Sequence, residues 1–183
     1  MQFRRDLGKA QAHFFSVWKE LSQEGLLPEK TAIGLRELRQ FVAYYAVLDL
    51  NEDGSVSIIH SGTGFDELWG RNIAGCSISE LAPAKALDLL TWFFKSMMQQ
   101  PCGGHSEEIF TKQTGERYQM DLLYLPVRKK DGAVAVAAMA DLKLLGPTDY
   151  IQFSSRSGEA GQVIQYADFI DVGHGIPAGY FES

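Results

Sequence analysis

The chain has 183 residues, of which 45% are hydrophobic and 22% are charged, and it carries a formal net charge of −6. This composition predicts one domain of ordinary size with an extension at one or both ends and excludes wholesale disorder. The negative charge disfavours nucleic acid as a partner, because phosphate binding needs a clustered positive surface. No apolar run approaches the roughly 20 residues of a membrane span, the N-terminus lacks the apolar segment of a signal peptide, and two cysteines suit a reducing cytosol. We therefore expect a cytoplasmic protein.

Residues 1–28 predict an N-terminal amphipathic helix and its connector. Apolar side chains recur at spacings of four and three over about residues 3–24, which places one apolar stripe on a helix, and Gly25 and Pro28 end it. The stripe must be buried, either on the chain's own domain or on the same helix of a second subunit. The candidate residues for a dimer or partner interface are Phe3, Leu7, Phe14, Val17, Trp18 and Leu21.

Residues 29–145 predict the central domain, which opens with a β-hairpin. Two strand-like runs, 43–50 and 55–61, flank a short turn that ends in Asp-Gly. Because side chains alternate along a strand, we expect Ile58 and His60 on the same face of the second run.

Several helices and then three more strands follow the hairpin. Glycines punctuate the segment 62–75, Ser77 and Glu80 have the spacing of a capping box, and Pro83 opens a helix that runs to about residue 99. The remaining strand-like runs are 105–112, 118–128 and 133–142. This order predicts an α+β fold, in which a five-stranded antiparallel sheet carries its helices on one face.

Residues 146–183 form an acidic C-terminal extension that contains glycines. The extension holds one basic residue against five acidic ones, and its segment 163–170 has the composition of one more strand. Elsewhere it has the composition of a loose segment that orders only against a partner.

A series of short motifs resembles a known family. The residues that carry the resemblance are Gly62-Thr63, Phe65, Leu68, Gly70-Arg71-Asn72-Ile73, Gly75, Glu80-Leu81, Leu125-Pro126-Val127 and Asp131-Gly132, with Trp18 in the leading helix. In this order and spacing they are similar to a bacterial PAS-like family, found mostly in alphaproteobacteria, over about residues 13–142. The chain departs from that family's pattern in its connector, where Lys30 replaces an Arg and Gly34-Leu35 lies near the position of a second Pro.

The resemblance implies a PAS fold and a non-catalytic signalling module. Such a module encloses a small molecule, or binds a protein partner or a second copy of itself as a homodimer, and transmits the change through its flanking helix or dimer interface. A pocket would lie between the inner face of the sheet and the helices, although the same side chains could equally form a packed core. Its candidate residues are Ile58, His60, Leu68, Trp69, Leu90, Phe94, Met120, Leu122, Val134 and Val136.

Two other classes of function stay open from the sequence. A haem- or flavin-bearing sensor would use His60 or Cys76, although Cys76 lies outside the motif of flavin-bonding PAS relatives, and the sequence requires no cofactor. An enzyme on a cone-like α+β fold would need a buried carboxylate. We expect Glu107-Glu108 at the surface, Asp121 pointing to solvent or a neighbouring subunit, and His105 exposed. No catalytic motif and no metal-site spacing is present.

Overall fold

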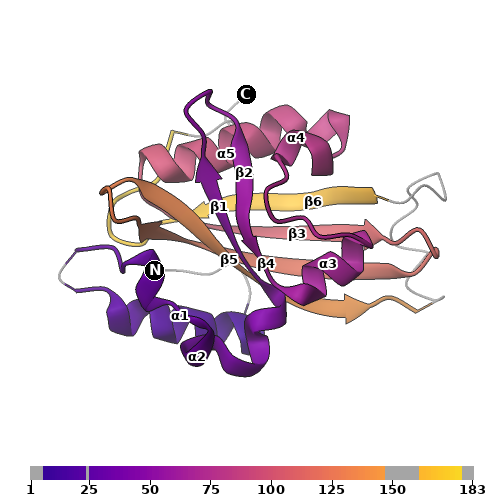
Figure 1. Cartoon of the computed structure of the whole chain (residues 1–183), viewed down its shortest axis with the longest axis horizontal. Coiled ribbons are helices and arrows are strands. Elements are labelled where there is room, and N and C mark those ends of the chain that lie inside the picture. The colour runs from indigo at the N-terminus through magenta and orange to yellow at the C-terminus, as the bar shows by residue number, and fades with distance from the viewer. Residues whose placement is uncertain (1–5, 24, 147–160, 179–183) are drawn as a thin grey trace.

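A single antiparallel sheet with the strand order β2-β1-β5-β4-β3-β6 forms the centre of the molecule (Figure 1). The computed structural model describes residues 6–23, 25–146 and 161–178. The strands are β1 (Tyr45–Leu50), β2 (Val56–Ser61), β3 (Gly103–Thr111), β4 (Arg117–Arg128), β5 (Val134–Leu144) and β6 (Gly161–Ile170). The helices are α1 (Lys9–Leu21), α2 (Leu35–Leu38), α3 (Thr63–Trp69), α4 (Ile78–Leu81) and α5 (Leu87–Gln99), with 3-10 turns at Lys30–Ala32, Arg39–Tyr44 and Ala84–Ala86.

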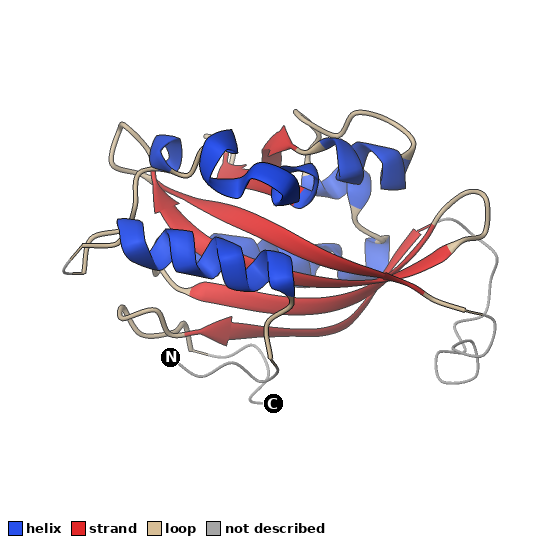
Figure 2. Cartoon of the chain, turned by 90° about the horizontal axis from the view of Figure 1, so that it is seen from below, coloured by secondary structure: helices blue, strands red, loops and turns tan. Residues whose placement is uncertain are grey.

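The sheet separates two hydrophobic cores. Helices α3, α4 and α5 cover one face, and their core includes Phe65, Leu90 and Phe94. Helix α1 covers the other face, where Phe14 and Trp18 pack on apolar residues of β1, β4 and β5. Figure 2 shows helices both in front of the sheet and behind it. The predicted antiparallel α+β fold with its N-terminal helix is confirmed, but the helices lie on both faces rather than on one.

The sheet has six strands, not the five that we predicted for its core. The sixth, β6, comes from the strand-like segment of the C-terminal extension, and it pairs antiparallel with β3 along its whole length. The prediction had five strands because the sequence of β3 does not indicate which distant segment pairs with its edge. An uncovered strand edge exposes unpaired backbone groups, and pairing with β6 satisfies those of β3.

The apolar stripe of α1 is buried on its own sheet. Phe14 is 0% exposed and Trp18 is 6% exposed, and the indole nitrogen of Trp18 donates to the carbonyl of Pro126 at 2.8 Å. Leu7, Val17 and Leu21 are half-buried, and Phe3 lies outside the described residues. We considered two ways to bury this stripe, on the chain's own domain or on a second subunit, and the structure shows the first. Phe14 and Trp18 are therefore not available to a second subunit.

The N-terminus of α1 is tied to the sheet by a carboxylate. Asp141 on β5 accepts hydrogen bonds from the backbone amides of Ala10 at 3.4 Å and Gln11 at 3.2 Å. These amides have no partner within the helix, and a negative charge is favourable beside the positive end of the helix dipole. A side chain at Gly8 would collide with the same carboxylate. The capping contact therefore fixes where the leading helix meets the sheet.

Two glycines of the central motif allow α3 to begin close to the preceding chain. A Cβ atom on Gly62 would overlap the backbone carbonyl oxygens of Val42 and Ala43, and one on Gly64 would overlap the ring of Tyr44. A side chain at position 62 would push two backbone segments apart, and one at position 64 would displace the ring of Tyr44. The motif therefore has a packing role, which positions α3 over the sheet.

A β-bulge in β2 changes the facing of His60. Val47 pairs with His60, but Leu48 pairs with Ile58, so Ile59 is an extra residue between them. Ile58 faces α3–α5 together with Leu48, whereas His60 faces the α1 side together with Val47. Our expectation that Ile58 and His60 share a face is wrong, because an inserted residue reverses the alternation of side chains.

Candidate ligand pocket

A cavity of about 70 Å³ lies between the sheet and helices α3–α5. This volume exceeds the ~15 Å³ that holds one water molecule and is smaller than the ~150 Å³ cavity that accepts benzene. Its walls are apolar except at one corner, which Glu108, Tyr124 and Gln162 form. The lining residues are Ala46, Leu48, Ile58, Phe65, Trp69, Ile73, Ile78, Leu81, Ala82, Leu90, Phe94, Glu108, Met120, Leu122, Tyr124, Ala138 and Gln162.

The structure brings most of the predicted pocket residues to this cavity. The predicted residues that line it are Ile58, Trp69, Leu90, Phe94, Met120 and Leu122. Leu68 and Val136 are buried in the surrounding core without lining the cavity, and Val134 is half-buried at the start of β5. His60 lies on the opposite face, where its ring is 5.7 Å from that of Tyr45 and its Nε2 atom is buried without a hydrogen-bond partner among the described residues.

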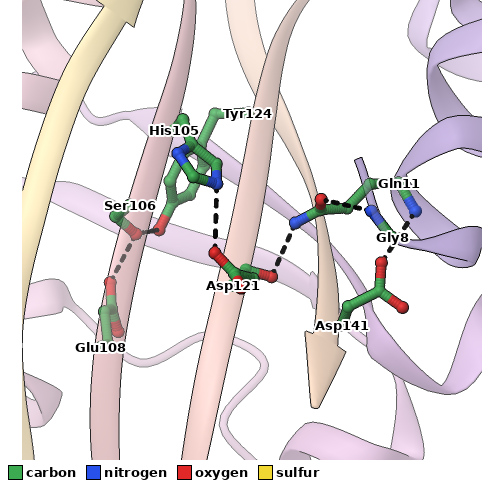
Figure 3. Close-up of polar contacts among 8 residues, drawn as sticks. All are labelled: Gly8, Gln11, His105, Ser106, Glu108, Asp121, Tyr124 and Asp141. Atoms are coloured by element: carbon green, nitrogen blue, oxygen red, sulfur yellow. Dashed lines mark hydrogen bonds and ion pairs between the residues drawn. The ribbon is translucent and has the colours of Figure 1, made fainter. Parts of the chain in front are cut away.

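The polar corner is built around the carboxyl group of Glu108 on β3. Glu108 is 1% exposed, and its Oε1 atom accepts a hydrogen bond from the hydroxyl of Ser106 at 2.8 Å. The side-chain amide of Gln162 on β6 donates to its Oε2 atom. The phenol of Tyr124 on β4 lies 3.1 Å from the same Ser106 hydroxyl (Figure 3). Three adjacent strands therefore supply the polar side chains of the cavity wall.

Our expectation that Glu107 and Glu108 lie at the surface is wrong. They are 6% and 1% exposed, because β3 lies between β4 and β6 and is therefore an interior strand. Strand alternation points Glu108 into the cavity and Glu107 to the α1 face. The strand-like segment 163–170 was the one signal for this burial, since a strand pairing with β3 would cover it.

Burial raises the pKa of the Glu108 carboxyl, although its hydrogen bonds to Gln162, Ser106 and Tyr124 act in the opposite direction. Removing a carboxylate from water favours its neutral form when no cation compensates. Burial also raises the pKa of Tyr124, and the neighbouring Glu108 adds to that rise. Burial therefore favours the uncharged forms of Glu108 and Tyr124, which can both donate and accept hydrogen bonds.

The raised pKa of Glu108 predicts a pH-dependent stability. The folded state binds this proton more tightly than the unfolded chain, so the contribution of Glu108 is greatest below the ordinary glutamate pKa and is lost as the pH rises toward the raised value. Relative to the wild type, Glu108→Gln should therefore gain unfolding free energy between about pH 5 and pH 7, by at most about 1.4 kcal/mol per pH unit.

Urea unfolding of both proteins at each pH checks this expectation. Glu67→Gln, which changes an exposed carboxyl on α3, is the matched control and should follow the wild type at every pH. A wild-type minus Glu108→Gln difference that stays constant with pH would contradict a buried, neutral Glu108.

The opposite face of the sheet carries a second polar group, which joins the sheet to α1 (Figure 3). The imidazole of His105 lies 3.2 Å from the carboxylate of Asp121, and the side chain of Gln11 donates to the Asp121 carbonyl at 2.9 Å. Our expectation of an exposed His105 is wrong, since His105 is 9% exposed. Asp121 was expected to point to solvent or a neighbouring subunit; its side chain is 31% exposed and also contacts His105. Strand β6 and helix α1 lie beside His105 and Asp121, and the sequences of β3 and β4 do not indicate that these two elements pack there.

Neither cysteine lines the cavity. Cys76 is half-buried before α4, where its carbonyl accepts from the amide of Ile58 at 2.9 Å, and Cys102 is buried beside β3. Across the described ranges, no group of three or more His, Cys, Asp or Glu side chains could hold a metal ion. None of the helices in these ranges has both the length and the apolar character to cross a membrane.

Comparison with known proteins assigns the fold to a family. Residues 8–139 match the family described as PAS domain. Similar solved structures are VqmA bound to DPO and the Vibrio cholerae VqmA dimer in the absence of target DNA, each with 15% identity and a TM-score of 0.48, which cover 64% of this chain. The PAS domain of a protein from Colwellia psychrerythraea has 15% identity and a TM-score of 0.41 and covers 58% of this chain.

The alignments cover different fractions of the solved chains. The alignments cover 59% and 54% of the two VqmA chains and 92% of the Colwellia chain, so this chain spans little more than half the length of VqmA. No curated protein matches the chain. The family match itself extends over well more than half of the sequence and includes both α1 and the helices over the cavity. The chain therefore belongs to the PAS domain family.

Proposed function

We propose that this chain is a non-catalytic regulatory domain that binds a small molecule in the cavity between the sheet and α3–α5. The observation that carries the proposal is an apolar cavity with one polar corner. Ligand sites in proteins combine apolar walls with a few polar groups that fix the orientation of the ligand. Membership of the PAS family supports a signalling role of this kind.

The signal would leave the domain through α1. This helix is attached to the sheet at both ends of its buried stripe, by Asp141 near its start and by Trp18 near its end. Strands β4 and β5 contribute to the cavity on one face and to the α1 contacts on the other. A ligand that shifts these strands would therefore shift α1 and its contact with a protein partner or a second copy of the chain. We propose a cytoplasmic, nucleic-acid-independent role, in keeping with the net charge of −6.

The alternative of a haem or flavin sensor has less support. Among the described residues no histidine lines the cavity, His60 lies on the far face of the sheet, and Cys76 is not a lining residue. The cavity of about 70 Å³ is also far below the size of either cofactor.

The buried carboxyl of Glu108 is the observation that favours an enzyme. General acid–base catalysis uses a carboxyl with a perturbed pKa in a pocket. Among the other cavity-lining residues of the described ranges, only Tyr124 is ionisable. These lining residues include no Ser, Thr, Cys or Lys that could act as a nucleophile. We therefore rank binding above catalysis.

A cavity-filling variant tests the proposed binding. Ala138 lies in the cavity wall on β5 and is 2% exposed, so Ala138→Val adds two methyl groups to the cavity. Native mass spectrometry of the protein purified from cells should show a small bound molecule on the wild type, and xenon should shift the NMR signals of cavity residues. Both signals should weaken at least about tenfold in Ala138→Val, whose fold circular dichroism can verify. A wild type that carries no molecule and does not respond to xenon would mean that the cavity is only a packing defect.

A further inference from the structure

The two edges of the sheet differ in how they are covered. The sheet ends at β2 on one side and at β6 on the other (Figure 1). On the outer side of β2, Ile58 exchanges backbone hydrogen bonds with Gly75 at 2.6 Å and Cys76 at 2.9 Å, and the bulge at Ile59 interrupts the strand. A covering segment and a bulge both keep an edge strand from pairing with another chain. The edge at β2 is therefore protected.

Strand β6 has comparable protection only in its second half. An extra residue, Gln165, forms a bulge in the pairing with β3, and beyond it the carboxylate of Asp168 accepts a hydrogen bond from the amide of Phe169 at 2.8 Å. Residues 161–164 have no bulge, no charged side chain and no proline. Among the described residues, no strand or loop pairs with their outer edge. Alternate residues of an edge strand direct their amide and carbonyl groups away from the sheet, so this segment has an unpaired hydrogen-bonding edge.

The chemistry of this edge requires an extended polypeptide as its partner. Only another strand carries amide and carbonyl groups at the spacing of the unpaired groups of β6. Val163 adds an apolar contact, because its side chain is 40% exposed on this segment. Gln162 and Ile164 are half-buried on the cavity side of the sheet, so their inner surfaces are already covered. A partner strand would therefore gain backbone hydrogen bonds and cover Val163.

The segment is complementary to itself. In a two-fold antiparallel pair centred on Val163, the two Val163 side chains would lie opposite each other, and Gln162 of each copy would lie opposite Ile164 of the other. Residues directly opposite each other must share a face of the joined sheet, and Gln162 and Ile164 do share one. The net charge of −6 opposes self-association in general, but this segment brings no like charges together. A second copy of the chain therefore fits the edge.

We propose that residues 161–164 form a homodimer interface, in which β6 of one copy pairs antiparallel with β6 of a second copy across a two-fold axis at Val163. The interface lies outside the residues that match the PAS family, which end at 139. It adjoins the cavity, because Gln162 lines the cavity and belongs to the paired segment. This surface is distinct from α1, and its pairing requires no ligand.

The oligomeric state of the full chain tests the interface. A short strand pair buries a small area, so sedimentation equilibrium should show monomers and dimers in exchange, with a Kd of roughly 10–100 μM. Val163→Lys places two ammonium groups opposite each other on the axis and should weaken the dimer at least about tenfold. Ile59→Lys is the matched control, because Ile59 is a 39% exposed apolar residue on the covered edge strand. This control should dimerise as the wild type does.

Disulfide cross-linking tests the position of the axis. Residues directly opposite each other in an antiparallel pair have Cα atoms about 4.5–5.5 Å apart, which a disulfide can span. Val163→Cys should therefore form a covalent dimer under mild oxidation several times faster than Ile59→Cys. Both variants retain Cys76 and Cys102, so the native cysteines contribute equally to the two rates. The cysteine variant keeps the test decisive if circular dichroism shows that Val163→Lys does not fold.

Each outcome supports or overturns the interface. A wild type that remains monomeric at about 1 mM would overturn it, as expected if a strand of another protein or another part of this chain occupies the edge of β6. A dimer that Val163→Lys leaves unchanged, or a Val163→Cys variant that cross-links no faster than Ile59→Cys, would also overturn it. These experiments need no ligand, so their results are independent of whether the proposed binding in the cavity is correct.

Discussion

Phe14→Ala is expected to lower the free energy of unfolding by about 3–5 kcal/mol, which is the usual cost of removing a fully buried aromatic ring. Phe14 is 0% exposed on the face of α1 that meets the sheet, and its ring packs edge-on against Tyr45 at 5.9 Å. The substitution leaves a cavity between α1 and strands that also form the pocket. Lys19→Ala, on the exposed side of the same helix, is the control and should change stability by less than about 0.5 kcal/mol.

The same experiment distinguishes an internal contact from a dimer contact. If Phe14 packs on its own sheet, the decrease in the free energy of unfolding that Phe14→Ala causes should be the same at every protein concentration. A loss that appears only at high concentration, with a change of mass in light scattering, would show that α1 packs on a second subunit instead.

Gly62→Ala is expected to lower the free energy of unfolding by about 3 kcal/mol or more, at the upper end of the overpacking range. The added Cβ would overlap the carbonyl oxygens of Val42 and Ala43, which belong to the backbone and cannot rotate away. Since Gly62 immediately precedes α3, relief requires α3 to move from the sheet, and the cavity that α3 covers should open. Thermal and urea unfolding measure the loss, and the signals of cavity residues in NMR report the displacement.

A second glycine of the same motif is the control for Gly62. Gly70 has φ = 66°, and among the described residues no heavy atom lies within 4 Å of the position that a Cβ atom would take there. Gly70→Ala should therefore cost only the ~1 kcal/mol of a left-handed backbone. If Gly62→Ala proved no more costly than Gly70→Ala, the close approach of α3 to the preceding chain would not be important for the fold.

Local residue patterns predicted most of the helices and strands, and the resemblance of short motifs predicted the family. The spacing of apolar residues predicts α1 and α5, strand-forming runs around an Asp-Gly turn predict β1 and β2, and Ser77 with Glu80 forms the capping box that their spacing indicates. These signals act over a few residues, because helix and strand periods and caps depend on neighbours along the chain. Of the ten candidate pocket residues, Ile58, Trp69, Leu90, Phe94, Met120 and Leu122 line the cavity, whereas His60, Leu68, Val134 and Val136 do not.

Contacts between distant segments decided the rest. The bulge at Ile59 turned His60 away from the cavity, and the neighbouring Ile58 exchanges backbone hydrogen bonds with Gly75 and Cys76, which are distant from it in the sequence. The pairing of β6 with β3 buried Glu108 and brought Gln162 to it, although the two residues are 54 positions apart in the chain. Burial and pKa depend on what covers a residue, and here the cover comes from a segment with no local relation to it. The motifs in the sequence, through their resemblance to a family, therefore predicted a PAS-type sheet with helices packed on it. Only the tertiary structure brought Glu108, Tyr124 and Gln162 together at one corner of the cavity, because they lie on three strands whose pairing depends on a distant segment.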